Sequence, residues 1–340
     1  MASGFTVATN EHLIRSNVWS RQLKELLLDD LNAMRFVRVL TDFPDGTTLN
    51  IPSIGEAETL DFAEGQAIKY NKMDTGNFVF SFDQYKYSAA SISAKFKRDS
   101  YYASDVISAF IPRQHRALME AVETRIFSRG DAGQTLGNQN LINGAAHRMV
   151  GTGAYAAGTL NGTAGLQTLA FRDFAKALYA LQKAQVPLVN LVAVVDPSVA
   201  YSIQTNASVT SLLSPMPMWE DVIQSSMVTG FKFRFNLYGF DVYISNYLPQ
   251  AAVAETISQP GFTGIAANTT TGTTPISNLF FSAAPGDTCP FVGGFRQMPT
   301  VFSEFNKDLQ QEEYVTIAEY GFKLYRPENM VIVVTDPAIV

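Results

Sequence analysis

The stretch FVFSFDQYKYSAASISAKF, residues 78–96, alternates between two kinds of side chain with a period of two. That period is typical of an extended strand with one apolar face. A strand of all 19 residues would span roughly 60 Å at 3.3 Å per residue. Paired with a second short strand, it predicts a two-stranded ribbon, which is marginal on its own in water and needs a neighbour to lie on. The aromatic residues that carry the alternation are Phe78, Phe80, Phe82, Tyr85 and Tyr87.

The segment before this ribbon predicts a helix, a turn and the partner strand. From Glu11 to Met34, apolar residues recur at mostly three- to five-residue steps between charged ones, which is typical of an amphipathic helix. Because little lies near it in sequence, we expect an arm that packs elsewhere in the fold or on another subunit. The turn cluster at 42–46 combines Pro and Gly, and Thr48-Leu49-Asn50-Ile51-Pro52 reads as a short strand.

The segment after the ribbon predicts a long helix over residues 104–128, roughly 37 Å at 1.5 Å per residue. Pro112 should kink or divide it, and one kinked helix is the preferred reading. Residues 130–165 are rich in Gly, Asn, Ala and Thr and read as a long loop.

The second half of the chain mixes strands and helices. A helix is expected around 171–181, and the apolar strand 191–195 ends at Asp196-Pro197, which suits a helix start with Asp as N-cap. A hairpin is expected over 231–246, an exposed loop over 250–275, and strands over 314–334 that bracket Arg326-Pro327. This order predicts an α+β fold.

The composition points to subunit contacts. The chain has 340 residues, with 25 Lys+Arg against 31 Asp+Glu, so its net charge is −6, which argues against charge-driven nucleic-acid binding. Charged residues make up 16% of the chain, against about 25% in ordinary soluble domains, while aromatic residues reach 12%. Interface cores are depleted in charge and enriched in aromatic residues. We find neither a secretory signal nor a membrane span, and the cytoplasm is the expected compartment.

Motifs of known chemistry are absent from the sequence. It contains no P-loop, dinucleotide-binding glycine fingerprint, zinc-protease helix or nucleophile elbow. The single Cys289 excludes an intrachain disulfide and reads as an inert thiol, and the three histidines are far apart. Glu56 and Glu58 read as a solvated loop edge rather than an acid–base pair, and the alternating Phe231–Phe235 segment as a half-buried strand rather than a base-stacking platform. We therefore predict no enzyme, no cofactor and no metal.

Four segments, taken in order, resemble the major capsid proteins of tailed double-stranded DNA phages, which have the Hong Kong 97-type shell fold. Residues 48–52 look like the strand leading into the family's extended loop, and residues 191–201 are similar to a strand-to-helix step in its axial domain. Residues 239–249 and 320–329 resemble two further segments. Each motif alone is degenerate, and the strength of the resemblance lies in the order.

The resemblance implies a Hong Kong 97-type α+β capsid fold with an N-terminal arm, an extended two-stranded loop, a long spine helix, and a peripheral domain into which an axial domain is inserted. The expected ranges are 1–43 for the arm, 44–97 for the extended β-loop, 98–185 for the peripheral domain with the spine helix, 186–300 for the axial domain, and 301–340 for the return strand of the peripheral domain.

The same resemblance implies a structural role. Copies of the chain would form hexamers and pentamers of an icosahedral shell that encloses double-stranded DNA without sequence-specific binding. The implied partners are a scaffolding protein, a portal protein at one vertex and a possible cement protein, with no membrane. The chain would reside in the virion after assembly in the host cytoplasm. An encapsulin-type nanocompartment shell is the close alternative, and a cytosolic enzyme with a site assembled from distant residues is the third.

Eight apolar or aromatic residues of the arm and the ribbon are the candidate intersubunit contacts. Phe80→Asp is expected to leave the subunit folded and to block assembly. The candidates are Leu23, Leu27, Phe62, Tyr70, Phe78, Phe80, Phe82 and Tyr85.

Overall fold

The computed structural model describes most of the chain between residues 31 and 336, and the predicted arm helix lies almost entirely outside this part. The described residues are 31, 33–40, 48–55, 59–61, 64–65, 67, 75–99, 103–127, 142, 145–155, 167–205, 233–248, 256–257, 268–269, 275–284, 286 and 288–336.

A four-stranded sheet has the order β1-β14-β15-β4. A 3₁₀ turn, η1, leads into β1, and the short helix α1 follows β4. The two longest strands of this sheet, β14 and β15, form an antiparallel hairpin, and β1 is parallel to the start of β14. The elements are η1 (Ala33–Phe36), β1 (Val37–Val39), β4 (Gln84–Ser93), α1 (Ala94–Asp99), β14 (Phe291–Asn306) and β15 (Gln311–Leu324).

A six-stranded mixed sheet has the order β5-β16-β13-β8-β10-β9. The helices α3 and α4 precede and follow β8, and the short 3₁₀ turn η4 precedes β16. The elements are β5 (His147–Val150), α3 (Phe171–Lys183), β8 (Leu191–Val195), α4 (Pro197–Thr205), β9 (Phe233–Leu237), β10 (Phe240–Ile244), β13 (Ile276–Ser282), η4 (Pro327–Asn329) and β16 (Met330–Thr335).

Three two-stranded pairs complete the described strands. The pair β2 (Thr48–Ile54) with β3 (Thr75–Ser81) is the longest, and the others are β6 (Gly153–Ala154) with β7 (Gln167–Thr168) and β11 (Thr256–Ile257) with β12 (Asn268–Thr269).

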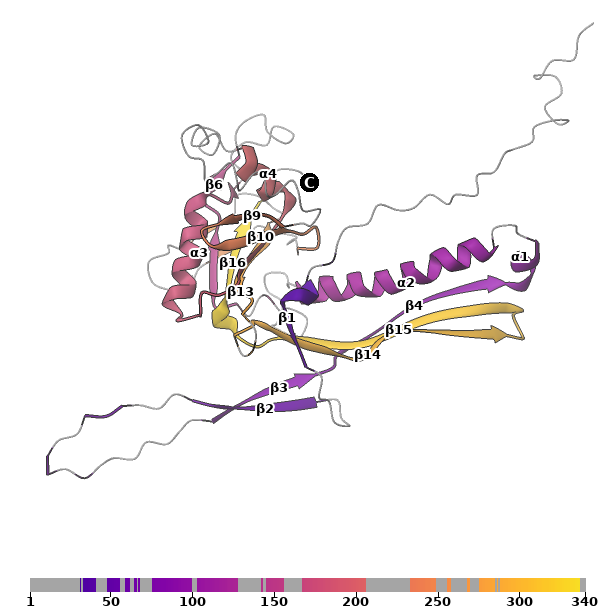
Figure 1. The fold of residues 1–340 in the computed structure, drawn as a ribbon, viewed down its shortest axis with the longest axis horizontal. Helices are drawn as coiled ribbons and strands as arrows, with labels where there is room; N and C mark the ends of the chain where they lie inside the picture. Colours follow the sequence, from indigo (N-terminus) through magenta and orange to yellow (C-terminus); the bar gives the residue numbers. More distant parts are fainter. Residues whose placement is uncertain are drawn as a thin grey trace, which may run out of the picture. The chain divides into compact units, whose positions relative to one another are not determined.

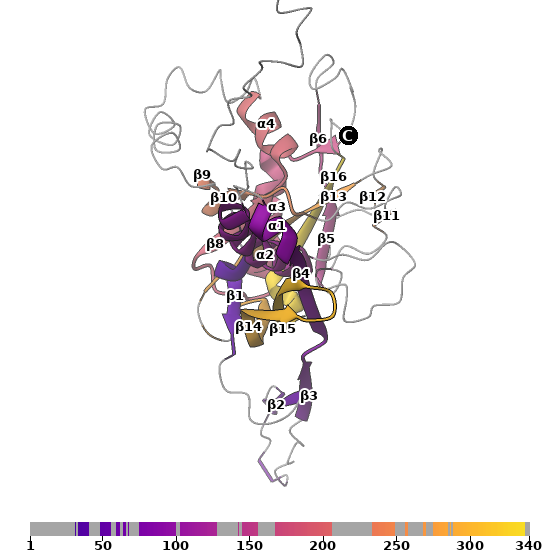
Figure 2. The same cartoon turned by 90° about the vertical axis from the view of Figure 1, so that its right-hand side faces the viewer.

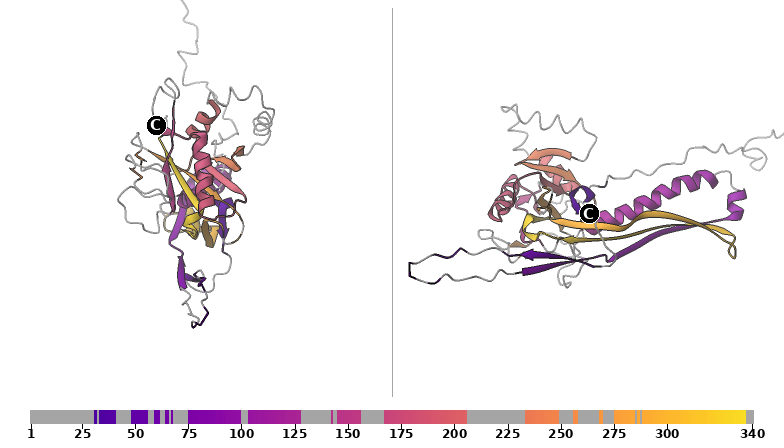
Figure 3. Two further views of the ribbon diagram at one scale, coloured as in Figure 1. Left: turned by 90° about the vertical axis from the view of Figure 1, so that its left-hand side faces the viewer. Right: turned by 60° about the horizontal axis from the view of Figure 1, so that its bottom comes forward.

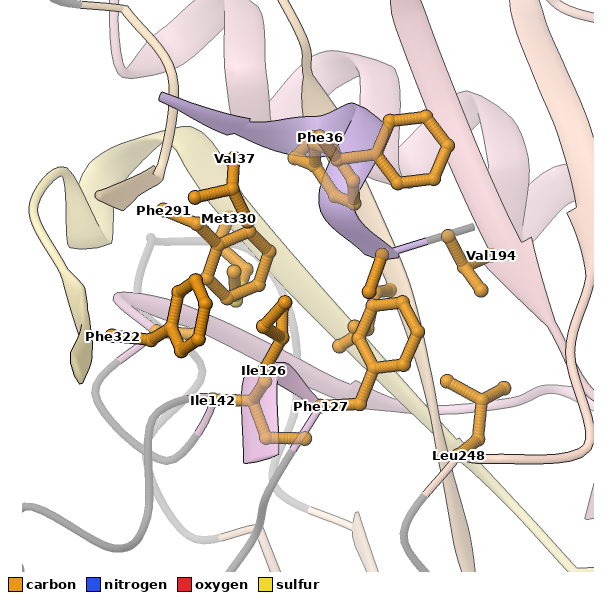
Figure 4. Close-up of a cluster of buried hydrophobic side chains, with 14 of the residues drawn as sticks. Phe36, Val37, Ile126, Phe127, Ile142, Val194, Leu248, Phe291, Phe322 and Met330 are labelled. Carbon is orange, nitrogen blue, oxygen red and sulfur yellow. The ribbon is translucent and has the colours of Figure 1, made fainter. Parts of the chain in front are cut away.

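Both faces of the six-stranded sheet are covered, which explains why β8 and β16 are almost continuous apolar runs and why β13, which also carries Ser277, Asn278 and Ser282, does not alternate. Every residue of these three strands is buried. On one face, Phe174 and Leu181 of α3 pack with Phe280 and Val333. On the other face, Ile126 and Phe127 at the end of α2 (Ala103–Ile126) join Phe36, Phe291 and Phe322, as Figure 4 shows. This second cluster connects the two sheets through one hydrophobic core.

The helix α2 lies on one face of the four-stranded sheet. It runs along β4 and β15 (Figure 1), and in Figure 2, which looks along the helix, the strands lie on one side of it. The buried side chain of Gln114 donates to the carbonyls of Ser88 and Tyr314 at 3.3 Å and accepts from the Thr316 hydroxyl at 3.2 Å. The helix predicted at 104–128 is confirmed as one element that contains Pro112.

The prediction of one long strand over 78–96 is wrong. The chain forms two strands, because β3 ends at Ser81 and pairs with β2, whereas β4 starts at Gln84 and pairs with β15. Residues from Ala94 onward form α1. The expected two-stranded ribbon is therefore the β2–β3 pair alone, and β4 belongs to a larger sheet.

Most other predicted elements are confirmed. They include β2, α3, β8, the β9–β10 hairpin and the strands β15 and β16 on either side of Arg326-Pro327. Asp196 caps α4, since its carboxylate accepts from the Ser198 backbone N–H at 2.9 Å. The sequence reading missed β5, within the expected loop of 130–165, and it missed β13 and β14.

The two sheets do not coincide with the domain ranges expected from the sequence. β5 and β16 lie in the same sheet as β8, β10 and β13, although they fall outside 186–300. The start of β14, which falls inside that range, belongs to the four-stranded sheet instead.

Candidate assembly surfaces

The root of the β2–β3 pair is fixed to the end of β15. Phe80 has no exposed surface, and its ring lies 5.4 Å from that of Phe82. A Cβ at Gly321 would lie 2.6 Å from the Ser81 carbonyl oxygen and 3.3 Å from Cζ of Phe80, so only glycine allows this approach. The Lys323 ammonium donates to the Val79 carbonyl at 2.9 Å. These contacts hold the end of β3 against β15 of the same subunit.

Seven of the eight candidates from the sequence fall into three groups, and Phe80 is a separate case. Leu23, Leu27, Phe62 and Tyr70 lie outside the described residues. Phe78 and Phe82 are half-buried at the hairpin root, where Phe78 meets the Tyr325 ring at 5.1 Å. Tyr85 is 61% exposed on β4.

Phe80 requires a correction. Its side chain is completely buried within its own chain, so an aspartate there would place a carboxylate in an apolar site. The expectation that Phe80→Asp leaves the subunit folded is therefore wrong.

The face of the four-stranded sheet opposite α2 is exposed and aromatic. Tyr85 and Tyr87, 61% and 70% exposed, occupy alternate positions of β4, opposite Glu319 and Ile317 of β15. Phe302 of β14, 51% exposed, stands opposite Val315 and continues the same face. Large exposed apolar groups that lie together are typical of protein–protein contact sites.

Charged groups gather around the β14–β15 turn. Lys97 of α1 forms an ion pair with Glu312 at 2.5 Å, and the Tyr314 hydroxyl donates to the same carboxylate at 2.8 Å. These hydrogen bonds raise the pKa of Lys97 and lower the pKa of Glu312, so both groups stay charged across the neutral range. The contact fastens α1 to the sheet, together with the Ala94 backbone N–H, which donates to the Gln310 carbonyl at 2.9 Å.

The sequence analysis did not identify the exposed apolar residues of β14, which lie on both faces of the four-stranded sheet. Met298, Val301, Phe302 and Phe305 are exposed along one strand, and Leu309 is exposed at its turn. Residues 300–305 do not alternate between apolar and polar, so the sequence carries no clear strand signal there, and exposure depends on which strands pair beside it.

Cys289 lies in an apolar setting unsuited to a nucleophile. It is buried, and its Sγ is 3.0 Å from the Phe36 carbonyl oxygen. Burial raises the pKa of the thiol, which lowers the thiolate fraction at neutral pH.

We expect Cys289 to be nearly unreactive towards Ellman's reagent in the native subunit at pH 8 and to react fully in denaturant. The reason is that both access and thiolate formation require opening of the core. The release of the coloured thiolate, followed with and without guanidinium, measures this difference. Equal rates in both states would contradict the buried placement.

Chemistry-bearing residues do not converge in the described part of the chain. There, no group of three or more His, Cys, Asp or Glu could hold a metal ion. One hollow, of about 350 Å³, has Lys95 and Asp99 as its charged lining residues. Another, of about 220 Å³, has Arg326 and Glu328. Over the same residues, no helix has the length and hydropathy of a membrane span.

Comparison with known proteins identifies the fold. No protein-family model and no curated protein sequence matches the chain. A chain in the capsid structure of the cyanophage P-SCSP1u matches with a TM-score of 0.65 at 15% identity, covering 97% of this chain and 94% of that one. A chain of Mycobacterium phage Che8 matches with a TM-score of 0.63 at 16% identity, covering 94% and 97%. A chain of the capsid of Ralstonia phage GP4 matches with a TM-score of 0.62 at 10% identity, covering 98% of both.

These likenesses span nearly the whole of both chains in each pair. The chain therefore has the mixed helix-and-strand fold found in phage capsid structures, and the resemblance read from the sequence is confirmed at the level of the fold.

Proposed function

We propose that the chain is the major capsid protein of a tailed double-stranded DNA phage. The observation that carries this proposal is the match in fold to phage capsid chains over almost their full length. The exposed aromatic face on β4, β14 and β15 supports it, because such a face is suited to contact between subunits. The role is structural rather than enzymatic.

The finer architecture belongs to the same proposal. α2 corresponds to the spine helix of a Hong Kong 97-type fold, and β2–β3 to the base of the extended loop of 44–97. The peripheral domain would contain α2, from the expected range 98–185, and the four-stranded sheet. The range 301–340 supplies β15 and the end of β14 to that sheet, whereas β1, β4 and the start of β14 lie outside both ranges. The six-stranded sheet forms the axial domain around the inserted range 186–300, and 1–43 is the arm.

Hexamers and pentamers of this subunit would close an icosahedral shell around DNA. Its net charge of −6 would weaken adhesion of packaged DNA to the wall. A scaffolding protein, a portal protein at one vertex and a possible cement protein are the proposed partners, and assembly takes place in the host cytoplasm. The contacts would include Phe78, Phe82 and Tyr85, with Leu23, Leu27, Phe62 and Tyr70 as further proposed positions.

The alternatives receive less support. An encapsulin-type shell is not favoured, since the similar structures reported above include the capsids of the cyanophage P-SCSP1u and of Ralstonia phage GP4. An enzyme would need a pocket that collects titratable groups, and neither of the two hollows described above gathers more than one acidic and one basic side chain.

We expect the chain to form closed shells or five- and six-membered rings when it is expressed with a candidate scaffolding protein. Many contacts between neighbours, each modest, sum to a stable shell. Size exclusion with light scattering, followed by electron microscopy, measures this outcome, and the chain expressed alone is the control. A monodisperse monomer or dimer in both preparations would overturn the proposal.

A further inference from the structure

We propose that residues 300–306 at the outer edge of β14 pair with the same segment of a second copy, antiparallel and centred on Ser303. The inference rests on the proposed function only in that shell assembly brings neighbouring copies together. Beyond that function, it specifies that the β14 edges of two copies pair with each other.

Among the described strands, only β1 pairs with the outer edge of β14, and it reaches only the start of that edge. β1 pairs only with Phe291 to Gly293, and the Leu40 backbone N–H adds one bond to the Gly293 carbonyl at 2.8 Å. Beyond Gly293, no strand in the described part of the chain lies on that side of β14. The hairpin that it forms with β15 runs beside α2, in gold in Figure 3. An open edge presents unpaired N–H and C=O groups that can template another strand.

The features that normally prevent edge-to-edge pairing of strands are bulges, prolines and lysines, and β14 has register irregularities and a proline before residue 300 but none of these features within 300–306. Two register irregularities and Pro299 lie between Phe295 and Thr300. From Thr300 to Asn306 the strand is in regular register with β15, and it contains neither Pro nor Lys. Bulges, prolines and lysines are the devices that keep natural edges apart, so this stretch is the part of β14 free to pair.

Both faces of the segment carry exposed apolar side chains. Val301 and Phe305 are 38% and 45% exposed on the α2 side of the sheet, where Val301 stands opposite Thr316, the residue bonded to Gln114. Phe302 is exposed on the opposite face. A paired strand would cover apolar surface on both faces at once.

An antiparallel pairing centred on Ser303 sets the exposed Val301 and Phe305 of the two copies against each other, which is why we assign a second copy as the occupant. Centred there, Thr300 stands opposite Asn306 of the partner subunit, Val301 opposite the partner's Phe305, and Phe302 opposite the partner's Glu304. Pairs of aromatic and β-branched residues stabilise antiparallel strands.

Neighbouring registers are poorer. A centre one residue later would place the two Glu304 carboxylates opposite each other, and like charges there are destabilising. A centre one residue earlier would bring Pro299 opposite Phe305 and extend the pairing into the irregular part of β14.

Cysteine substitution tests the register directly. In assembled particles treated with a mild oxidant, Ser303→Cys should give a disulfide-linked dimer of twice the subunit mass, because residues directly opposite have Cα atoms about 4.5–5.5 Å apart. Thr300→Cys alone is the matched control, since its two copies would lie about 20 Å apart, six residues along the strand. The double variant T300C/N306C should link again. The native Cys289 is buried and does not compete.

Ser303→Lys gives a second readout that does not depend on oxidation. A lysine at the exposed edge should leave the circular dichroism and unfolding midpoint of the subunit unchanged and reduce particle yield. If S303C and T300C/N306C remain monomeric on non-reducing gels while particles form, and S303K assembles normally, the edge inference is overturned and the shell function stands. If the unmodified chain forms no particles under any condition, the proposed function fails instead.

Discussion

Replacing Phe80 by alanine should lower the free energy of unfolding of the subunit by about 3–5 kcal/mol, the cost typical of removing a fully buried phenylalanine. The ring has no exposed surface and lies between Phe82 and the backbone at Gly321. Because the backbone of β15 at Gly321 and the Lys323–Val79 hydrogen bond hold β15 against β3, the surroundings have little freedom to close the cavity. The loss should therefore lie in the upper part of the range for core substitutions.

Val79→Ala is the matched control for this experiment. Val79 is the adjacent residue of the same strand, and its side chain is exposed. We expect a change within about 0.5–1 kcal/mol, as for surface positions. Urea unfolding followed by tryptophan fluorescence and circular dichroism gives both midpoints. Equal midpoints for the two variants would show that Phe80 is not part of the core.

Elements whose signals are local could be predicted from the sequence. The β8 strand and the start of α4 follow from an apolar run that ends at Asp196-Pro197, where the cap and the first helical residue are neighbours. The β9–β10 hairpin follows from Tyr238-Gly239, both of which have positive φ, at 51° and 83°. In each case the residues that decide the structure lie within a few positions of one another.

Elements defined by distant partners could not be predicted. The alternation over 78–96 does not reveal that β3 pairs with β2 while β4 pairs with β15. Asp83, at the junction, forms an ion pair at 2.6 Å with Arg125 at the end of α2, a contact that no spacing in the sequence indicates. Likewise, β5 lies in a stretch of loop-like composition and becomes a strand because β16 pairs beside it.

The candidate surface was predictable only in part, for the same reason. Phe80 and Tyr85 are both aromatic residues of the same alternating stretch, yet Phe80 is buried and Tyr85 is 61% exposed. The difference arises because β15 closes over Phe80, whereas the side of β4 that carries Tyr85 faces away from α2. Sequence periodicity identifies a face, and only the fold shows whether another element covers it.

Asp173→Ala should lower the free energy of unfolding by about 2–5 kcal/mol, because it leaves two backbone N–H groups without their acceptor in a buried site. Asp173 is near the start of α3 and has no exposed surface. Its carboxylate accepts from the Thr152 backbone N–H at 2.8 Å, the Thr152 hydroxyl at 2.6 Å and the Ala170 backbone N–H at 3.0 Å. It therefore holds the segment after β5 against the helix that covers the six-stranded sheet.

Lys176→Ala separates this buried network from the surface charge beside it. Lys176 lies 3.6 Å from the Asp173 carboxylate, but its side chain is partly exposed, so its ion pair should contribute less than about 1 kcal/mol. Chemical denaturation of both variants, with amide hydrogen exchange along α3, measures the two effects. We expect Asp173→Ala to lose protection in the first turn of α3 and Lys176→Ala to keep it. Similar midpoints and similar exchange in the two variants would contradict the capping role, because the surface charge would then account for the whole effect.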